Sequence, residues 1–177
     1  NLVNVHIATN NMAKLVNTID RILAIDPNNT QVLPIKARIM EKQGNNEQAL
    51  EAYGRLYAMN PNSIEIISGL ARANFNIATK IVNEGATIAD DAQYAVVRQR
   101  ASQYLMDAHD LFIKILQAEP TSVKYMQGLA GVYQFMDMDS EYEVMKQIIN
   151  EGASYATFSD KLTAYNAQLK QSNLAST

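Results

Sequence analysis

Apolar residues recur at three- and four-residue spacing along most of this chain, a pattern typical of amphipathic helices. Two such runs lie between residues 30 and 63, with apolar positions Leu33, Ala37 and Met40 in the first and Ala49, Tyr53 and Leu56 in the second. The turn-forming residues Gly44, Asn45 and Asn46 separate the runs, and the second ends before Pro61, which cannot continue a helix. The pattern predicts a helix–turn–helix unit of about 34 residues.

The spacing of prolines extends this unit along the chain. Pro27 and Pro61 are 34 residues apart, whereas Pro61 and Pro120 are 59 apart, which leaves 25 extra residues in the third unit. Twenty-five residues are about seven helical turns, so a lengthened hairpin would keep each apolar stripe on its original face. We expect antiparallel helices over 63–84 and 90–118, with a projecting tip and Gly85 as a C-terminal capping glycine. Asp90 or Asp91 would start the return helix, whose apolar positions are Val97, Ala101, Leu105, Ala108, Phe112 and Ile115.

The segment before residue 30 is expected to contain the end of one helix and the whole of another. Residues 2–8 would finish the first, and Thr9 or Asn10 would cap the second. The inward positions of this second helix are predicted to be Leu15, Ile19, Ile22 and Leu23.

The segment after residue 122 repeats features of the third unit. Gly128, Leu129 and Ala130 echo Gly69, Leu70 and Ala71 at an offset of 59, and small residues here would let helices approach closely. Ser140 and Glu143 fit a capping box, and Gly152 follows the predicted helix. A last helix with a polar back would close the array, with apolar positions Phe158, Leu162, Tyr165 and Leu169.

The full 34-residue period resembles the tetratricopeptide repeat. The residues in the family's slots are Leu33, Ala37, Met40, Ala49, Tyr53 and Pro61, while Lys36 departs from the preferred leucine. The resemblance implies an all-α, right-handed superhelix (solenoid) of helical hairpins in a single domain, residues 1–177. Its parts would be a truncated repeat (1–29), a regular repeat (30–63), a repeat with an elongated hairpin (64–122), a further repeat (123–156) and a capping helix with a tail (157–177).

Composition narrows the classes of protein. The net charge of −3 does not favour nucleic acid as a partner, and no apolar run is long enough to span a membrane. The absence of cysteine excludes disulfides and thiolate zinc sites. We expect a soluble protein of the cytoplasm or periplasm, although the sequence does not decide between these. Because residue 1 is Asn1 rather than methionine, the chain is expected to be a fragment or a processed form, and repeats or a signal peptide could precede it.

Candidate chemistry is sparse. The two histidines, His6 and His109, lie near neither a serine–acid pattern nor a glycine-rich phosphate loop. The acidic residues from Asp137 to Glu141 lack the turn glycine and closing glutamate of a calcium loop, and helix capping explains them better. We therefore expect no enzyme activity, no cofactor and no metal.

The resemblance places a binding surface on the first helix of each pair, which faces the concave groove in tetratricopeptide arrays. The groove positions are Arg38, Glu41, Lys42, Arg72, Phe75, Asn76, Lys124, Gln127, Gln134 and Phe135. Arg38 and Arg72 share one slot and could bracket a partner's carboxylate. Alternatively, Glu41 and Glu65 neutralise them as ion pairs. The family's chaperone-binding subclass uses a clamp that only Lys124 matches here, since Gln127 and Gly131 do not complete it.

Two functions remain open. The favoured one is a non-catalytic scaffold that binds a protein or peptide segment in its concave groove. The alternative is an architectural module of a larger assembly, with self-association through the long hairpin. An enzyme on an α–α scaffold is the least favoured.

Overall fold

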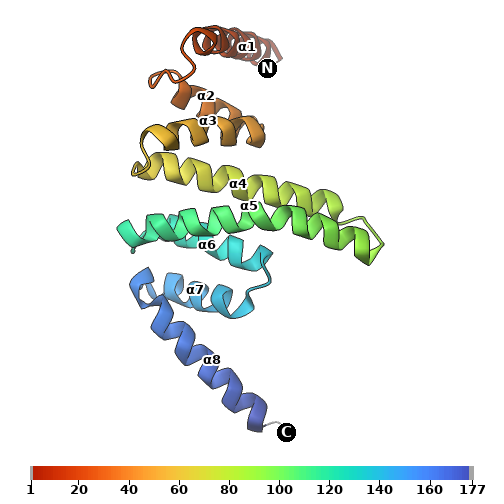
Figure 1. The fold of residues 1–177 in the computed structure, drawn as a ribbon, viewed down its shortest axis with the longest axis vertical. Helices are drawn as coiled ribbons and strands as arrows, with labels where there is room; N and C mark the ends of the chain where they lie inside the picture. Colours follow the sequence, from red (N-terminus) through yellow and green to blue (C-terminus); the bar gives the residue numbers. More distant parts are fainter. Residues whose placement is uncertain (1, 176–177) are drawn as a thin grey trace. The chain divides into compact units, whose positions relative to one another are not determined.

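All the regular secondary structure in the described part of the chain is helical. The computed structural model describes residues 2–175, and the side chains of residues 11–171. No strand occurs among these residues, which confirms the predicted all-α class. In chain order the helices are α1 (Leu2–Ile25), α2 (Leu33–Lys42), α3 (Asn46–Met59), α4 (Ile64–Gly85), α5 (Asp91–Ala118), α6 (Val123–Phe135), α7 (Asp139–Glu151), the short 3₁₀ helix η1 (Tyr155–Thr157) and α8 (Phe158–Ala175) (Figure 1).

Contacts within the chain divide it into two compact units. Unit 1 comprises Asn1–Ala73 and unit 2 comprises Asn74–Thr177. The division falls inside α4, so this helix contributes residues to both. Each unit has buried apolar residues of its own.

Unit 1 is organised around the hairpin of α2 and α3, which lie side by side (Figure 1). Gly44 lies in the turn between them with a φ of 73°, a left-handed conformation that glycine adopts without strain. The core of the unit contains all six apolar positions predicted for this hairpin, together with Ala52 of α3. The neighbouring helices α1 and α4 add Ile19, Leu23 and Ala73.

Helix α1 differs from the expectation in two ways. It runs unbroken past Thr9 and Asn10, so the predicted helix end and cap at these residues are wrong. Neither residue prevents a helix from continuing, as a proline would. Leu15 and Ile22 are exposed rather than buried. Helix α2, which packs against α1, has 10 residues to the 24 of α1, so it covers only part of the apolar stripe.

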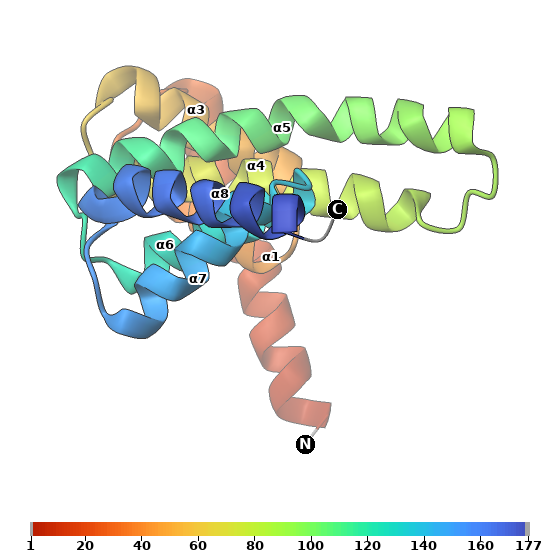
Figure 2. The same ribbon diagram turned by 90° about the horizontal axis from the view of Figure 1, so that it is seen from below.

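The predicted long hairpin is confirmed, because α4 and α5 begin and end within one residue of the expected bounds, 63–84 and 90–118. Within unit 2, the end of α4 lies beside α5, and the tip of the hairpin extends beyond α6 and α7 (Figure 2). Asp90 caps α5 by accepting a hydrogen bond from the backbone N–H of Gln93 at 2.8 Å. Gly85, however, is the last residue of α4 and has no positive φ, so the predicted capping role is wrong. A Cβ at Gly85 would lie 2.6 Å from Val97 Cγ1, so this glycine instead permits close helix approach.

The rest of unit 2 continues as a chain of neighbouring helices, in which α5 contacts α6, α6 contacts α7 and α7 contacts α8. Gly152 ends α7 with a φ of 64°, as its position predicted. The capping box at Ser140 is wrong, because α7 begins one residue earlier, at Asp139, and its N-cap is Met138. In α8, Phe158 is buried whereas Leu169 is exposed.

An aromatic ring packed against a glycine recurs in both units. In unit 1, Tyr53 lies against Gly69, where a Cβ would be 2.2 Å from Tyr53 Cε1. In unit 2, Phe112 lies against Gly128, where a Cβ would be 2.6 Å from Phe112 Cζ. Both members of the second pair lie 59 residues after those of the first, the offset that separates Pro61 from Pro120. The expected close approach at these glycines is therefore present in each unit.

The predicted small core positions are also buried: Ala37 and Ala71 have no exposed surface, and Ala130 is 6% exposed. Within residues 2–175, no helix is long and apolar enough to cross a membrane.

Candidate functional site

Two of the predicted groove residues of unit 1, Glu41 and Arg72, meet in a polar cluster at the end of α2. Arg72 of α4 approaches this carboxylate with two nitrogens, Nε at 2.5 Å from Oε1 and Nη2 at 3.1 Å from Oε2. The Tyr53 hydroxyl of α3 donates to Glu41 Oε2 at 2.8 Å, and Arg72 Nη1 donates to Ser68 Oγ. Two parallel N–H···O bonds are the strongest arrangement that arginine makes with a carboxylate. Arg72 therefore binds a carboxylate of its own unit rather than standing open for that of a partner.

The electrostatics of this cluster keep Tyr53 neutral. Burial of the phenol raises the pKa of Tyr53 above its ordinary range, and the hydrogen bond to Glu41 raises it further. A neutral phenol remains a donor, so the ring is tied to Glu41 at one end and packed against Gly69 along its side. The cluster therefore links α2, α3 and α4.

Arg38 is placed differently from Arg72. Its Nη2 lies 3.6 Å from Glu65 Oε1, and both side chains are largely exposed, at 59% and 73%. Exposed pairs of this kind contribute little, about 0–1 kcal/mol. Each arginine thus pairs with one of the glutamates that the sequence offered as its neutralising partner. The bidentate pair of Arg72 with Glu41 is the stronger, and the exposed pair of Arg38 with Glu65 is the weaker. Lys42, the third predicted residue of α2, is exposed.

In unit 2, the predicted residues of α6 form one stripe at helical spacing. We call Lys124, Gln127, Gly131, Gln134 and Phe135 the α6 stripe. Lys124, Gln127 and Gln134 are exposed, and Phe135 is half-buried.

Phe75, from the part of α4 in unit 2, lies over this stripe. Its ring meets that of Phe135 edge to face, with centroids 5.6 Å apart, and a Cβ at Gly131 would stand 3.1 Å from Phe75 Cζ. Phe75 and its neighbour Asn76 are both half-buried. The two rings thus form an aromatic centre on α4 and α6, with exposed lysine and amide side chains along the same stripe.

A cleft of about 310 Å³ adjoins the α6 stripe at Phe135. Its lining residues are Val82, Arg98, Gln99, Ala101, Ser102, Leu105, Phe135 and Met136. Arg98 Nη2 donates to Asp137 Oδ2 of the turn after α6. Asp137 has a φ of 57°, a left-handed conformation that aspartate tolerates better than most residues.

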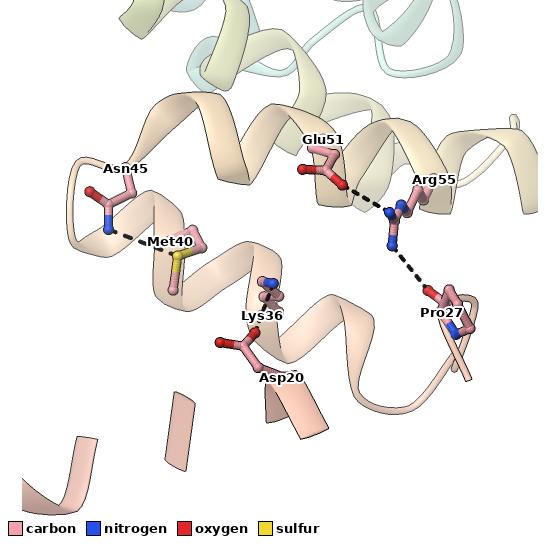
Figure 3. Close-up of polar contacts among 7 residues, drawn as sticks. All are labelled: Asp20, Pro27, Lys36, Met40, Asn45, Glu51 and Arg55. Carbon is pink, nitrogen blue, oxygen red and sulfur yellow. Dashed lines mark hydrogen bonds and ion pairs between the residues drawn. The ribbon is translucent and has the colours of Figure 1, made fainter. Parts of the chain in front are cut away.

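Two further recesses lie elsewhere. In unit 1, a polar cleft of about 320 Å³ is lined by residues of α1, α2 and α3. Figure 3 shows two of its ion pairs: Lys36 with Asp20 at 2.8 Å, and Arg55 with Glu51 at 2.9 Å. In unit 2, an apolar recess of about 360 Å³ lies among Leu116, Gln117, Pro120, Tyr155, Ala156, Phe158 and Ser159. The first holds its charges in mutual pairs, and the second has no charged lining residue.

Groups suited to catalysis do not converge in the described residues. His109 Nδ1 lies 2.9 Å from its chain neighbour Asp110, and its ring meets Tyr133 edge to face. Among residues whose side chains are described, no group of three His, Cys, Asp or Glu residues could hold a metal ion. His6 lies outside those side chains. The groups that do come together in unit 2 are a pair of aromatic rings, exposed amides and an arginine beside a cleft.

Comparison with protein-family models and with curated proteins found no match to this chain.

Sequence reasoning missed Tyr53 and Ser68 as partners of the Glu41–Arg72 pair, and it missed Arg98 altogether. The helical period assigned Tyr53 to the core, where its ring does lie, but it carries no information on the hydroxyl. Nothing in the pattern of α5 distinguishes Arg98 from its neighbour Arg100. The one available signal was Asp137, an acidic residue in a turn.

Proposed function

We propose that this chain is a non-catalytic protein-interaction module that binds a segment of a partner protein along the α6 stripe and Phe75. The observation that carries the proposal is the half-buried pair of Phe75 and Phe135, which lies beside exposed Gln127 and Gln134. Binding energy in protein interfaces concentrates in aromatic anchors surrounded by polar residues that exclude water. The surface fits an extended or helical peptide better than a small molecule, because the residues follow a helix rather than enclose a cavity.

We also propose that the helices form tetratricopeptide-like repeats within a right-handed superhelix. Support comes from the recurrence of one packing detail in both units: Tyr53 against Gly69, and Phe112 against Gly128. The same offset relates the buried residues Ala49 and Ala108. In such an array, α2, α4 and α6 would be first helices, and the ten predicted positions would share a groove. A measured solution structure with a different order of neighbouring helices would refute this arrangement.

The binding proposal is tested by selecting displayed random 16-residue peptides on the immobilised chain. The affinity of the enriched peptides is then measured for a Gln127→Arg/Gln134→Arg variant, which adds bulk and charge to the α6 stripe. The matched control is Asn150→Arg/Gln168→Arg, with exposed positions on α7 and α8. We expect the first variant to lose at least about tenfold in affinity and the control to retain it. Failure to enrich any peptide, or equal affinities for both variants, would refute the proposal.

A second function, self-association through the long hairpin, is favoured by one feature of α5. Val96, the sixth residue of α5, is 65% exposed close to the turn of the hairpin. Burial of this valine against a second copy of the chain would remove apolar surface from water. Deleting residues 77–102 is not a suitable test, because it would remove the buried residues Ile77, Ala78 and Ala101.

Substitution of Val96 by aspartate tests self-association without disturbing the core. The measurement is sedimentation velocity over a hundredfold range of concentration. A concentration-dependent assembly that Val96→Asp abolishes, while Ala95→Asp on the same exposed stretch does not, would establish the hairpin as its interface. A monomer throughout that range would exclude this second function.

A further inference from the structure

The cleft beside Phe135 combines an apolar floor with a single charged residue. Val82, Leu105 and Phe135 supply apolar surface from α4, α5 and α6. Gln99 and Ser102 are neutral, so Arg98 is the only charged residue among those that line the cleft. A volume of about 310 Å³ lies at the lower end of ligand pockets, which suits one or two side chains rather than a cofactor.

The partner of Arg98 in this structure is poorly buried. The Asp137 side chain is 75% exposed, whereas that of Arg98 is 30% exposed. Asp137 accepts from Nη2, and this is the one side-chain bond that Arg98 makes within the described residues. The guanidinium has five N–H donors, so most remain for another acceptor. Exposed ion pairs of this kind contribute little, and a second carboxylate can replace Asp137 at small cost.

The backbone at Asp137 adds an independent observation. The residue closes α6 in a left-handed conformation, where glycine or asparagine is usual. Residues held in such conformations cluster at binding sites and switch regions. Here the turn in which Asp137 adopts this conformation places its carboxylate beside Arg98.

We propose that this cleft binds an apolar side chain of the partner segment, and that Arg98 binds the carboxylate of an aspartate or glutamate next to it in that segment. The incoming carboxylate displaces Asp137, which acts as an internal competitor. Charge complementarity determines the choice of ligand: an apolar floor with one arginine favours an acidic residue over a basic one. The inference rests on the proposed peptide-binding function and specifies the partner's chemistry at one end of the α6 stripe.

The test uses the same displayed peptides on the full chain and on two variants. Arg98→Gln removes the proposed carboxylate partner, and Arg100→Gln, an exposed arginine on the same helix, is the charge-matched control. We expect the wild type and Arg100→Gln to enrich peptides with an acidic residue adjacent to an apolar one. Arg98→Gln should still enrich peptides but without that acidic preference, and it should bind the wild-type peptides at least about tenfold more weakly.

A third variant, Asp137→Asn, gives a change in the opposite direction. Asparagine also tolerates the left-handed backbone, so the substitution removes the competing charge alone. The selected acidic peptides should bind this variant up to about fivefold more tightly, the factor that corresponds to a surface ion pair of about 1 kcal/mol. Thermal melts of each variant would verify that the fold is retained.

The outcomes separate the two proposals. An acidic preference that persists in Arg98→Gln, or weaker binding by Asp137→Asn, would overturn the role of this cleft while peptide binding stands. If the wild type enriches peptides that show no acidic preference, the role of this cleft is likewise overturned while peptide binding stands. Enrichment of no peptide at all would overturn both.

Discussion

Replacement of Gly69 by alanine tests whether the Tyr53 ring packs directly on the backbone of α4. The new Cβ would lie 2.2 Å from Tyr53 Cε1 and 2.3 Å from Cζ, closer than carbon atoms approach in folded proteins. Tyr53 as a whole is 4% exposed and its hydroxyl is bonded to Glu41, so the ring has little room to move.

The magnitude follows from three contributions. Overpacking in a core costs about 1–3 kcal/mol. Displacing the ring would also weaken the Tyr53–Glu41 hydrogen bond, at about 1 kcal/mol. Alanine in a helix recovers about 1 kcal/mol relative to glycine. We therefore expect a net loss of about 1–3 kcal/mol, and about 2 kcal/mol would lower the melting temperature of a chain of this length by roughly 4–8 °C.

The assay is thermal unfolding followed by far-ultraviolet circular dichroism, with Gly54→Ala as the control. Gly54 lies inside α3, and a Cβ there would meet nothing within 4 Å, so this variant should be neutral or stabilised by up to about 1 kcal/mol. In a Tyr53→Leu background, which lacks the ring, Gly69→Ala should lose most of its cost. Equal stabilisation by the two alanine substitutions in the wild-type background would refute the packing argument.

Three other predictions follow from the same packing. Gly128→Ala should destabilise unit 2 by about 1–3 kcal/mol, because its Cβ would meet the Phe112 ring at 2.6 Å; an unchanged melt would contradict this. Ala71→Leu should cost about 1–3 kcal/mol in urea unfolding, since Ala71 has no exposed surface, and a wild-type midpoint would show that the site has spare volume. Burial raises the pKa of Tyr53, so the folded chain holds this proton more tightly than the unfolded chain, for which the pKa is about 10. The resulting stability should be complete below about pH 9 and decline as pH rises above 10, and Tyr53→Phe should show a shallower decline when midpoints at pH 8 and 10.5 are compared.

The helical hairpins were predictable because their signals are local and mutually consistent. The prolines at 61 and 120 set the length of the long hairpin, and the three- and four-residue spacing identified Leu105, Phe112 and Ile115 as buried. These are properties of a single helix and its ends, which the chain encodes within a few turns.

The failures concern features that depend on a neighbouring helix. Gly85 has the sequence context of a capping glycine, but it continues α4 and lies against Val97, twelve residues later. Thr9 and Asn10 are good caps, yet capping competes with continuation of α1, and the residues themselves permit both.

The sequence predicted which residues of the candidate site share a helix face, but not which hydrogen bonds and ion pairs they make. The resemblance to the tetratricopeptide repeat placed Phe75 and Phe135 on a common surface, and their rings do meet. It also gave Arg38 and Arg72 equivalent slots, whereas Arg72 is bidentate on Glu41 and Arg38 is only weakly paired. Side-chain hydrogen bonds depend on rotamers and distances between helices, which no periodicity specifies.

The turn between α4 and α5 has a consequence for how this chain can change. Residues 86–90 join two helix ends that extend past α6 and α7, so a longer or shorter hairpin would alter few other contacts (Figure 2). Each added turn on both helices would carry the tip about 5.4 Å outward and preserve the faces that pack below it. We therefore expect a change in hairpin length to alter the reach of the tip with little effect on stability, and the tip to accept an attached fluorophore, epitope or second domain.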